Sequence, residues 1–438
     1  MTGQYEESVP VVVLKFDPNI FHHGALGIVR SLGRLGVPMY AVQEDRWAPM
    51  ARSRYLRDKL LWMDAQARKE ALPRLLRLGH ALEGRAILIP TDDVGSIFVA
   101  EHARELEECY LFPRQDPALV RSLCSKKELY HLCRKFDVPA PETWFPTSRE
   151  EVLDLVEGAV FPLVLKAMDP WLLHRATRLA SVVIANDADE LLKWYDQMED
   201  PRHPNLMIQE YIPGGPESVW MYNGYFNAHS ESLVHFTGTK LRQHPPYTGM
   251  TTLGICSSNE VVEATTKRFM KAIGYRGIVD MGYRYDVRDG QYKLLDVNPR
   301  IGATFRLFVG TDGIDVARAL HLDLTGQPVE TAGAREGRKW LVENYDTISS
   351  LQYVRDGRLT PAAWLRSFRG VDEGAWFAFD DPLPFAVMSL RFLARGPAKL
   401  LEVLRSADSS GAGRRVGRSS GLPDANPVDS KPRGQGGS

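Results

Sequence analysis

The chain has 438 residues, of which 44% are hydrophobic and 25% are charged, so it is long enough for two or three globular domains. A formal net charge of −1 argues against a nucleic acid as the main partner, because domains that bind a phosphate backbone are normally basic. No apolar run is long enough to cross a bilayer, and the cysteines have no CxxC or Cys/His spacing. Because nothing at the start looks like a secretory signal, we expect a cytoplasmic protein.

The first 120 residues predict an α/β domain built on a parallel sheet. Strand and helix patterns alternate in the order strand 9–14, helix 25–35, strand 38–42, helix 67–82 and strand 86–90. This alternation predicts parallel strands with helices on the faces of the sheet, and ligands at the carboxyl ends of the strands. No GxGxxG follows the first strand, which disfavours a dinucleotide cofactor.

Polar residues that follow two of these strands are candidate substrate residues. His22 and His23 precede the first helix, and Thr91 and Asp92 precede a later one. Backbone amides at a helix N-terminus favour an anion such as a carboxylate. The alternative interpretation is that Thr91 and Asp92 only cap a helix.

Lysines stand at the start of a helix and at the end of a strand in the next part of the chain. Lys126 opens a helix that ends at about residue 136, before a proline-containing stop at 138–141. Lys166 ends the apolar strand 161–167, where a charge must reach water or meet an anion. The loop at 168–179 is basic and has no glycine. By itself this loop is equally compatible with a solvated basic turn.

A strand at 206–212 runs into a glycine-rich break, and a hairpin follows it. The strands of this hairpin are expected at 220–227 and 232–239. Lys240 and Arg242 come directly afterwards and are candidates to contact phosphate or a substrate carboxylate. Gly249 suggests either a close approach to a ligand or a plain turn.

A second hairpin carries acidic residues that are candidates to bind a metal ion. Its strands are expected at 278–285 and 292–297, around a turn at 286–290. A loop centred on Arg288 would place Asp280 directly opposite Asp296. On this register one face carries Ile278, Asp280, Gly282, Leu294, Asp296 and Asn298.

Facing carboxylates destabilise a sheet unless a counter-ion lies between them. Mg²⁺ takes oxygen ligands from one or two carboxylates, water and phosphates, so Asp280, Asp296 and Asn298 are the predicted metal ligands. Arg300 would stand beside the metal as a cation for phosphate. The alternative is an ordinary hairpin whose polar residues only end a strand before Pro299.

The segment Asp296-Val297-Asn298-Pro299-Arg300 after this hairpin resembles the metal-binding end of the ATP-grasp superfamily. The resemblance covers about residues 9–326 and includes the two lysines and the Glu-Tyr-Ile break in their expected order. It implies that Arg300, Lys240 and Arg242 are catalytic, and that Asp280 supplies the acidic ligand of the first strand. Gly282 is the alternative position for this acidic ligand on the same face, but it has no side chain that could bind a metal. The implied ATP-binding residues are Lys126, Lys166, Arg178, Gln209, Glu210, Tyr211, Ile212 and Glu217.

The implied architecture combines α/β and α+β parts. A Rossmann-like parallel-sheet domain at 1–120 would precede an ATP-grasp domain at 121–330, which contains a small lid at about 140–212 and a larger α+β subdomain. A helical or mixed extension is expected at 331–405. The composition of 406–438, rich in Ser, Gly, Arg and Pro, predicts disorder.

The implied activity is ligation of a small-molecule carboxylate to an amine through an acyl phosphate, with ATP and Mg²⁺, or Mn²⁺ in its place, as cofactors. Two rivals use the same scaffold: an enzyme that phosphorylates bicarbonate, and a non-catalytic ATP-binding module. A third is a structural subunit that acts through the C-terminal region. A homo-oligomer is compatible with all of these, and the identity of the two substrates is not encoded in any motif.

Overall fold

The computed structural model describes residues 8–43, 45–61, 69–82, 84–168, 182–247, 249–330 and 332–394. Arg178, most of the basic loop around it and the predicted tail at 406–438 lie outside these residues. Residues 1–390 form one compact unit. Within the described residues, no helix is both long enough and apolar enough to cross a membrane.

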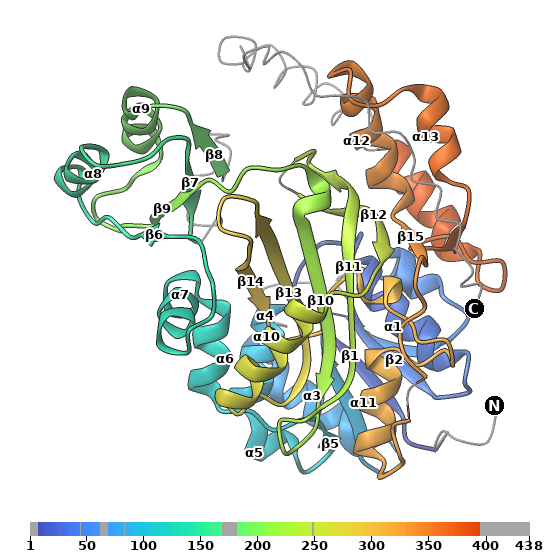
Figure 1. Ribbon diagram of the computed structural model, residues 1–438. Helices are drawn as coiled ribbons and strands as arrows, with labels where there is room; N and C mark the ends of the chain where they lie inside the picture. The colour runs from blue at the N-terminus through green and yellow to red at the C-terminus, as the bar shows by residue number, and fades with distance from the viewer. Residues whose placement is uncertain are drawn as a thin grey trace, which may run out of the picture. The chain divides into compact units, whose positions relative to one another are not determined.

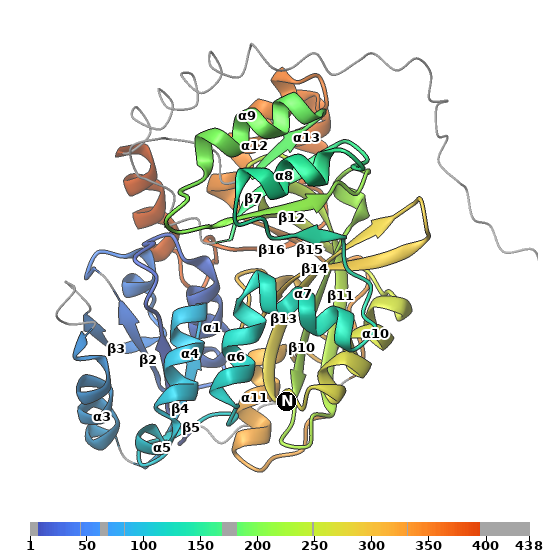
Figure 2. The same ribbon diagram turned by 90° about the vertical axis from the view of Figure 1, so that its left-hand side faces the viewer.

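The N-terminal part is a five-stranded, wholly parallel sheet in the order β3-β2-β1-β4-β5 (Figure 2). Its strands are β1 (Val11–Leu14), β2 (Met39–Gln43), β3 (Leu56–Leu61), β4 (Ala86–Pro90) and β5 (Tyr110–Leu111). Its helices are α1 (His23–Gly33), η1 (Pro49–Arg52), α3 (Ala71–Ala81), α4 (Asp93–Glu101), α5 (Ala103–Leu106) and α6 (Pro117–Cys124). The parallel arrangement follows from the alternation of apolar runs with helical segments, because each helix carries the chain back across the sheet.

Alternate side chains of these strands point to opposite faces of the sheet and pack against different helices. Val12 and Leu14 of β1 pack in a core that includes Leu75 of α3 and Val99 of α4. Helix α1 contacts β1 and β2 but contributes nothing to that core, so it covers the other face. Because α1 starts at the carboxyl edge of the sheet, His22 and His23 lie at this edge.

A small antiparallel sheet occupies the middle of the chain, with strands in the order β6-β9-β7-β8. Its strands are β6 (Thr143–Trp144), β7 (Leu163–Ala167), β8 (Val182–Ala185) and β9 (Leu206–Glu210) (Figure 1). The helices α8 (Arg149–Val156) and α9 (Ala188–Met198) belong to the same part of the chain. Leu163, Leu165 and Leu191 belong to its own hydrophobic core. Lys166 alternates with Leu165 and therefore points to the opposite face. Helix α7 (Lys126–Lys135) precedes this sheet.

The largest sheet has seven strands in the order β14-β13-β10-β11-β12-β15-β16 (Figure 1). Its first five strands along the chain are β10 (Val219–Phe226), β11 (Ser232–His244), β12 (Met250–Cys256), β13 (Gly277–Asp286) and β14 (Gln291–Asn298). One face packs on α7 and on α10 (Glu260–Ala272), through residues that include Cys133, Phe269 and Val279. The other face carries Asp280. The short helices η2 (Pro216–Ser218) and η3 (Phe305–Leu307) and helix α11 (Val316–Leu324) complete this part.

The C-terminal extension continues the same sheet. Strand β15 (Lys339–Leu341) pairs antiparallel with β12, and β16 (Val371–Gly374) pairs parallel with β15. Helices α12 (Glu343–Arg355) and α13 (Pro361–Ser367) connect these two strands, and a further helix runs from 383 to 394. Two extra strands therefore depend on residues beyond the predicted boundary at 330.

The predicted register of the β13–β14 hairpin is wrong by two residues. Asp280 pairs with Asn298, and Gly282 pairs with Asp296. One residue of the shift comes from the turn, since Asp286 pairs with Gln291 and the loop is not centred on Arg288. The other comes from a bulge at Leu295, between the pairs Gly282/Asp296 and Tyr283/Leu294.

The bulge also overturns the predicted face. Leu294 lies in the hydrophobic core with Val297, so it does not share a face with Asp296 as expected. An extra residue inserted into one strand reverses the alternation on one side of the bulge. Asp280 and Asp296 are consequently diagonal neighbours on one face and not a directly opposed pair.

Candidate active site

The site is built on the row of side chains across β14, β13 and β10, on the face of the sheet opposite α7 and α10. Cross-strand partners share a face, so the pairs Asn298/Asp280 and Asp280/Asn223 place two carboxamides on either side of one carboxylate. In the next row, Asp296 stands opposite Gly282. A Cβ atom at Gly282 would meet no atom within 4 Å, so there is open space above Gly282, next to the side chain of Asp296.

Asp280 is held closely from above by the loop that follows β14. A Cβ atom on Gly302 would lie only 2.3 Å from Oδ2 of Asp280, so any larger residue here would force the carboxylate or the loop to shift. Burial raises the pKa of Asp280 to about 6, with Asp296 adding to the rise and Arg300 opposing it. Removal of water is therefore the main cost of ionising this carboxylate, and a nearby cation would reduce it.

Cations from three different elements surround this carboxylate pair. Nζ of Lys126, at the start of α7, is 4.0 Å from Oδ1 of Asp296. Burial, followed by the charge of Lys126, lowers the pKa of Lys166 to about 8. Burial also lowers the pKa of Lys240, although Asp280 and Asp296 oppose the change. The site thus holds lysines whose charge a polyanion would stabilise.

Arg300 links the acidic row to the N-terminal domain. Its Nη2 donates to Oδ1 of Asn298 at 3.0 Å, and its Nε donates to Oδ1 of Asp93 at 2.8 Å. Burial lowers the pKa of Arg300, but the carboxylates of Asp93, Asp280 and Asp296 outweigh it and raise the pKa overall. The guanidinium is therefore charged and fixed between the metal-binding motif and the first turn of α4.

The predicted nucleotide hinge lies at the end of β9, close to these lysines. Nζ of Lys166 donates to Oε1 of Gln209 at 2.7 Å. Glu210 uses its side chain structurally, accepting from Lys293 at 2.7 Å and from Arg288 at 2.8 Å. Ile212 is buried.

Two further hinge residues lie around Arg284. This arginine donates to the carbonyl oxygen of Gly214. The charges of Tyr211 and Glu217 partly oppose the effect of burial, which lowers the pKa of Arg284. Glu217 also accepts from the backbone N–H of Gly215 at 3.0 Å. The hinge therefore contains the acceptor carboxylate of Glu217, which the resemblance implies as an ATP-binding residue.

Of the predicted substrate residues, His22 interacts electrostatically with Arg300 of this cluster. Burial lowers its pKa to about 3, with Lys15, His23 and Arg300 adding to the effect, so the ring is neutral. Its Nδ1 accepts from the N–H of Ala25 at 3.2 Å, which leaves the ring proton on Nε2. His22 is thus a neutral donor from the N-terminal domain.

The remaining substrate predictions correspond to structural contacts. His23 is buried between Trp340 and Trp376. Thr91 donates to the carbonyl of Leu14, and Asp92 accepts from Gly95 and from the N–H groups of Phe16 and Asp17. The capping alternative therefore describes the contacts of Asp92. A Cβ on Gly249 would lie 2.0 Å from the backbone of His244, so the close approach there is to the chain itself and not to a ligand.

Arg242 does not join the cluster, which corrects its predicted catalytic role. Its Nε and Nη2 donate to the two carboxylate oxygens of buried Asp346 at 2.7 and 2.9 Å. Nη1 donates to Ser367. The β11 strand has register shifts on both sides of Arg242, and these turn its side chain away from the face that carries Lys240.

Sequence reasoning missed Arg284 and Asn223 and one contact of Asp93. Arg284 lies on the same face as Asp280 by strand alternation, so the pattern contained a signal for it. Asp93 belongs to the polar loop at 91–93 that the sequence suggests for the substrate side, but its contact with Arg300 was not predicted. Asn223 is far from the motif in sequence, and only strand pairing brings it to Asp280.

The donor set fits Mg²⁺ in chemistry. Asp280, Asp296 and Asn298 offer hard oxygen atoms, and Mg²⁺ typically takes one or two carboxylates and completes its shell with water and phosphate. Within the described residues there is no group of three or more His, Cys, Asp or Glu side chains placed to hold a metal by themselves. The protein ligands would therefore need nucleotide phosphates to complete the coordination.

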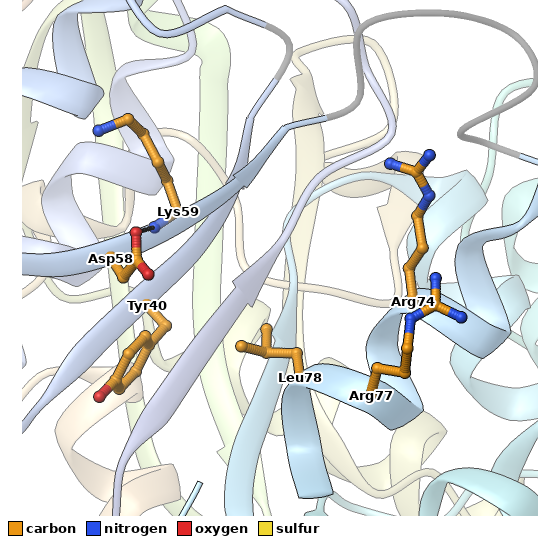
Figure 3. A pocket seen from close by; sticks show the side chains of 6 residues that line it. All are labelled: Tyr40, Asp58, Lys59, Arg74, Arg77 and Leu78. Atoms are coloured by element: carbon orange, nitrogen blue, oxygen red, sulfur yellow. Dashed lines mark hydrogen bonds between the residues drawn. The ribbon is translucent and has the colours of Figure 1, made fainter. Parts of the chain in front are cut away.

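A second hollow lies elsewhere, between β2, β3 and α3 (Figure 3). Tyr40, Asp58, Lys59, Arg74, Arg77 and Leu78 line this cavity of about 280 Å³. Lys59 and Arg77 are exposed, and none of the candidate site residues borders the hollow. Solvent-exposed cations at the rim of this cavity do not by themselves indicate a ligand-binding site, so we assign the cavity no role.

Comparisons with known proteins place this geometry in context. No family model matches the chain. It is 26% identical over 334 residues to D-aspartate ligase of Enterococcus faecium (strain Aus0004), an alignment that covers 73% of this chain and 77% of that protein.

Two solved structures share the fold. One is an L-amino acid ligase from Bacillus licheniformis, with a TM-score of 0.52 and 15% identity over 72% of this chain and 74% of that one. The other is the biotin carboxylase domain of Hydrogenobacter thermophilus 2-oxoglutarate carboxylase in complex with MgADP, ADP and bicarbonate. It has a TM-score of 0.55 and 15% identity over 75% of this chain and 73% of that one.

Proposed function

Because the chain belongs to the ATP-grasp superfamily of carboxylate-amine-ligase-like proteins, we propose that it is an ATP-dependent ligase. It joins a carboxylate to an amine and forms ADP and phosphate. The observation that carries the proposal is the meeting of Asp280, Asp296, Asn298 and Arg300 with lysines from α7 and β7. The similarity to D-aspartate ligase supports amino acids as the first substrates to test.

The proposed reaction has two steps. A carboxylate oxygen of the acid attacks the γ-phosphorus of ATP, the bond from that phosphorus to the β-phosphate oxygen breaks, and ADP leaves. The amine nitrogen then attacks the acyl carbon, the carbon–oxygen bond to phosphate breaks, and the nitrogen loses a proton. No protein nucleophile is required, so the catalytic task is to position the reactants and balance charge.

The residues of the site suit this task. Lys126 and Lys166 would bind triphosphate oxygens, and Arg300 would bind the transferred phosphoryl group and the acyl phosphate. Asp280, Asp296 and Asn298 would hold Mg²⁺, which neutralises charge on the β- and γ-phosphates when bound. Lys240 faces the same carboxylates and would contact the phosphoryl group or the substrate carboxylate.

The test is a screen for ADP release with carboxylic acids crossed with amines, with Asp296→Ala as the blank. We expect ADP release that requires both substrates together. A wild-type protein that binds ATP but releases no ADP across a broad panel would replace the proposal with a non-catalytic ATP-binding module.

One rival keeps specific support. The structural neighbour with bound bicarbonate shares this fold, so bicarbonate belongs in the same panel. ADP release with bicarbonate alone, and none with organic acids, would favour the bicarbonate-phosphorylating alternative.

The proposal extends to cofactors, location and assembly. Mg²⁺ is the expected metal, and Mn²⁺ should support activity in its place because it accepts the same oxygen ligands. All four cysteines are unpaired, which supports a reducing cytoplasmic location. Light scattering would decide whether the protein is a homo-oligomer.

A further inference from the structure

The inference concerns Asn223, a residue of β10 in the row of side chains that also contains Asp280. Asn223 has no solvent-exposed surface. Its cross-strand neighbours are Asp280 on β13 and Phe236 on β11. The carboxamide therefore has a carboxylate on one side and an apolar ring on the other.

The carboxamide of Asn223 lacks a well-formed hydrogen bond. Neither Nδ2 nor Oδ1 has a hydrogen-bond partner of normal geometry among the residues that the structure describes. The carboxamide is nevertheless close enough to Asp280 for an imperfect hydrogen bond that opposes the rise in the pKa of that carboxyl. A buried carboxamide without partners is energetically unfavourable, because its polar groups have lost water without gaining a hydrogen bond, so its presence calls for a physical explanation.

The other neighbours of Asn223 on the same face are not hydrogen-bond partners for its carboxamide. Met221 and Tyr225 flank Asn223 along the strand. The sulfur of Met221 accepts from Thr251, and the hydroxyl of Tyr225 donates to Asp323 at 2.6 Å. Asp280 is the neighbour with acceptor oxygens to spare, and the backbone of Gly302 confines this carboxylate from another side.

We propose that Asn223 is a positioning residue for the metal ligand Asp280. Nδ2 would donate to one oxygen of Asp280 when the other oxygen binds the metal, and Oδ1 would accept from a water in the metal's shell. A residue that fixes a ligating carboxylate in this way tunes metal affinity. The inference rests on the proposed function, because it assumes that Asp280 holds the nucleotide's metal.

The experiment uses Mn²⁺ and ADP as probes on the full chain. Asn223→Leu has nearly the same size but neither donates nor accepts, so the packing of β10 is kept. We expect its affinity for Mn²⁺ in the ADP complex, measured by electron paramagnetic resonance, to fall by about 10-fold or more. Its affinity for ADP without metal, measured by calorimetry, should remain within about twofold of wild type.

Tyr222→Phe is the matched control on the same strand. Tyr222 belongs to the hydrophobic core on the opposite face, so this variant should keep both affinities. A merely structural role for Asn223 would instead lower ADP and Mn²⁺ affinity together, or lower the melting temperature sharply.

The outcomes separate the inference from the function on which it rests. If wild type binds Mn²⁺ with ADP and Asn223→Leu binds it equally well, the role of Asn223 is overturned and the ligase proposal stands. If wild type binds neither probe, the ligase proposal fails first. A fall in Mn²⁺ affinity alone supports both.

Discussion

Arg300 shows how one side chain joins two parts of the molecule at the proposed active site. It follows the proposed metal ligands Asp296 and Asn298 in sequence, yet its Nε is 2.8 Å from Asp93 at the start of α4. Charge-assisted hydrogen bonds of this kind hold a guanidinium in a fixed orientation. A phosphoryl acceptor bound beside Arg300 is therefore also in reach of the N-terminal domain, where His22 offers a neutral donor.

Gly302 gives a prediction at this scale. Gly302→Ala would place a methyl group 2.3 Å from Oδ2 of Asp280, so the carboxylate or the loop must move. We expect kcat/KM for ADP release to fall by about 100-fold, because a shift of about 1 Å at a catalytic group has this effect.

The control is Gly158→Ala, since a Cβ at Gly158 meets no atom within 4 Å. Thermal melting should show a folded protein in both cases. Full activity in Gly302→Ala would mean that the position of Asp280 is not important.

Lys166 gives a pH-dependent prediction. Its pKa is lowered to about 8, so the ammonium is charged below pH 8 and neutral above it. If the charged form binds the triphosphate, affinity for ATP should fall as the pH rises above about 8, by up to about tenfold per unit. Calorimetric titration of ATP between about pH 6.5 and 9.5 measures this effect.

Lys166→Arg is the comparison, because a guanidinium keeps its charge over this range. Its ATP affinity should be nearly independent of pH. A flat profile in the wild type would exclude Lys166 as a phosphate ligand.

At the scale of elements, the β13–β14 hairpin is tied to the small sheet by buried charges. Asp286 is fully buried and bonds to Arg288 and Lys293, which also bond to Glu210 at the end of β9. The hydrogen bond from Arg288 holds the pKa of Asp286 well below its usual range, although burial opposes this. The network fixes the end of β9, the predicted nucleotide hinge, relative to the hairpin that carries the proposed metal ligands.

Lys293→Met tests this network. The variant keeps the length of the side chain but leaves Asp286 with one cation, so we expect the free energy of unfolding in urea to fall by roughly 3 kcal/mol. Arg149→Gln, which breaks an exposed ion pair with Asp196, should leave the free energy of unfolding nearly unchanged. Equal effects of the two changes would show that the buried network is not a stabilising feature.

At the scale of the whole molecule, the C-terminal extension is part of the fold. It adds β15 and β16 to the largest sheet, and it supplies Asp346 to Arg242, Asp381 to Arg30 and Glu373 to Arg306. These arginines are buried, and removing their partners would leave uncompensated charges in the interior. The rival interpretation, a structural subunit that acts through the C-terminal region, would therefore act through a part of the chain that is built into the fold.

Truncation after Ala334 tests this statement. We expect a chain without cooperative thermal unfolding, because β12 loses its neighbour β15 and the buried arginines lose carboxylates. Arg30 and Arg242 lose Asp381 and Asp346, and Arg306 keeps only Asp315. The point variant Asp346→Ala should lower the free energy of unfolding by about 3–5 kcal/mol. A truncated chain that melts like the full-length protein would contradict the assignment.

Local sequence was sufficient for the order of elements and for the motif at 296–300. The parallel N-terminal sheet follows from the alternation of strand and helix patterns, and the acidic hairpin was placed from β-branched runs around a turn. Resemblance to a family supplied the roles of Lys126 and Lys166, and the structure brings both lysines to the carboxylates. These features depend on neighbours in the chain or on residue order, which a sequence displays directly.

Only the tertiary structure decided which residue pairs with Asp280 on β14, which carboxylate binds Arg242, and that Asn223 lies next to Asp280. A bulge at Leu295 and an even-numbered turn moved the hairpin by two residues, and neither leaves a clear pattern in the sequence. Arg242 found a buried carboxylate more than a hundred residues away, as the pairing with Asp346 shows. Contacts between distant segments depend on how sheets pair and pack, and that information is distributed over the whole chain.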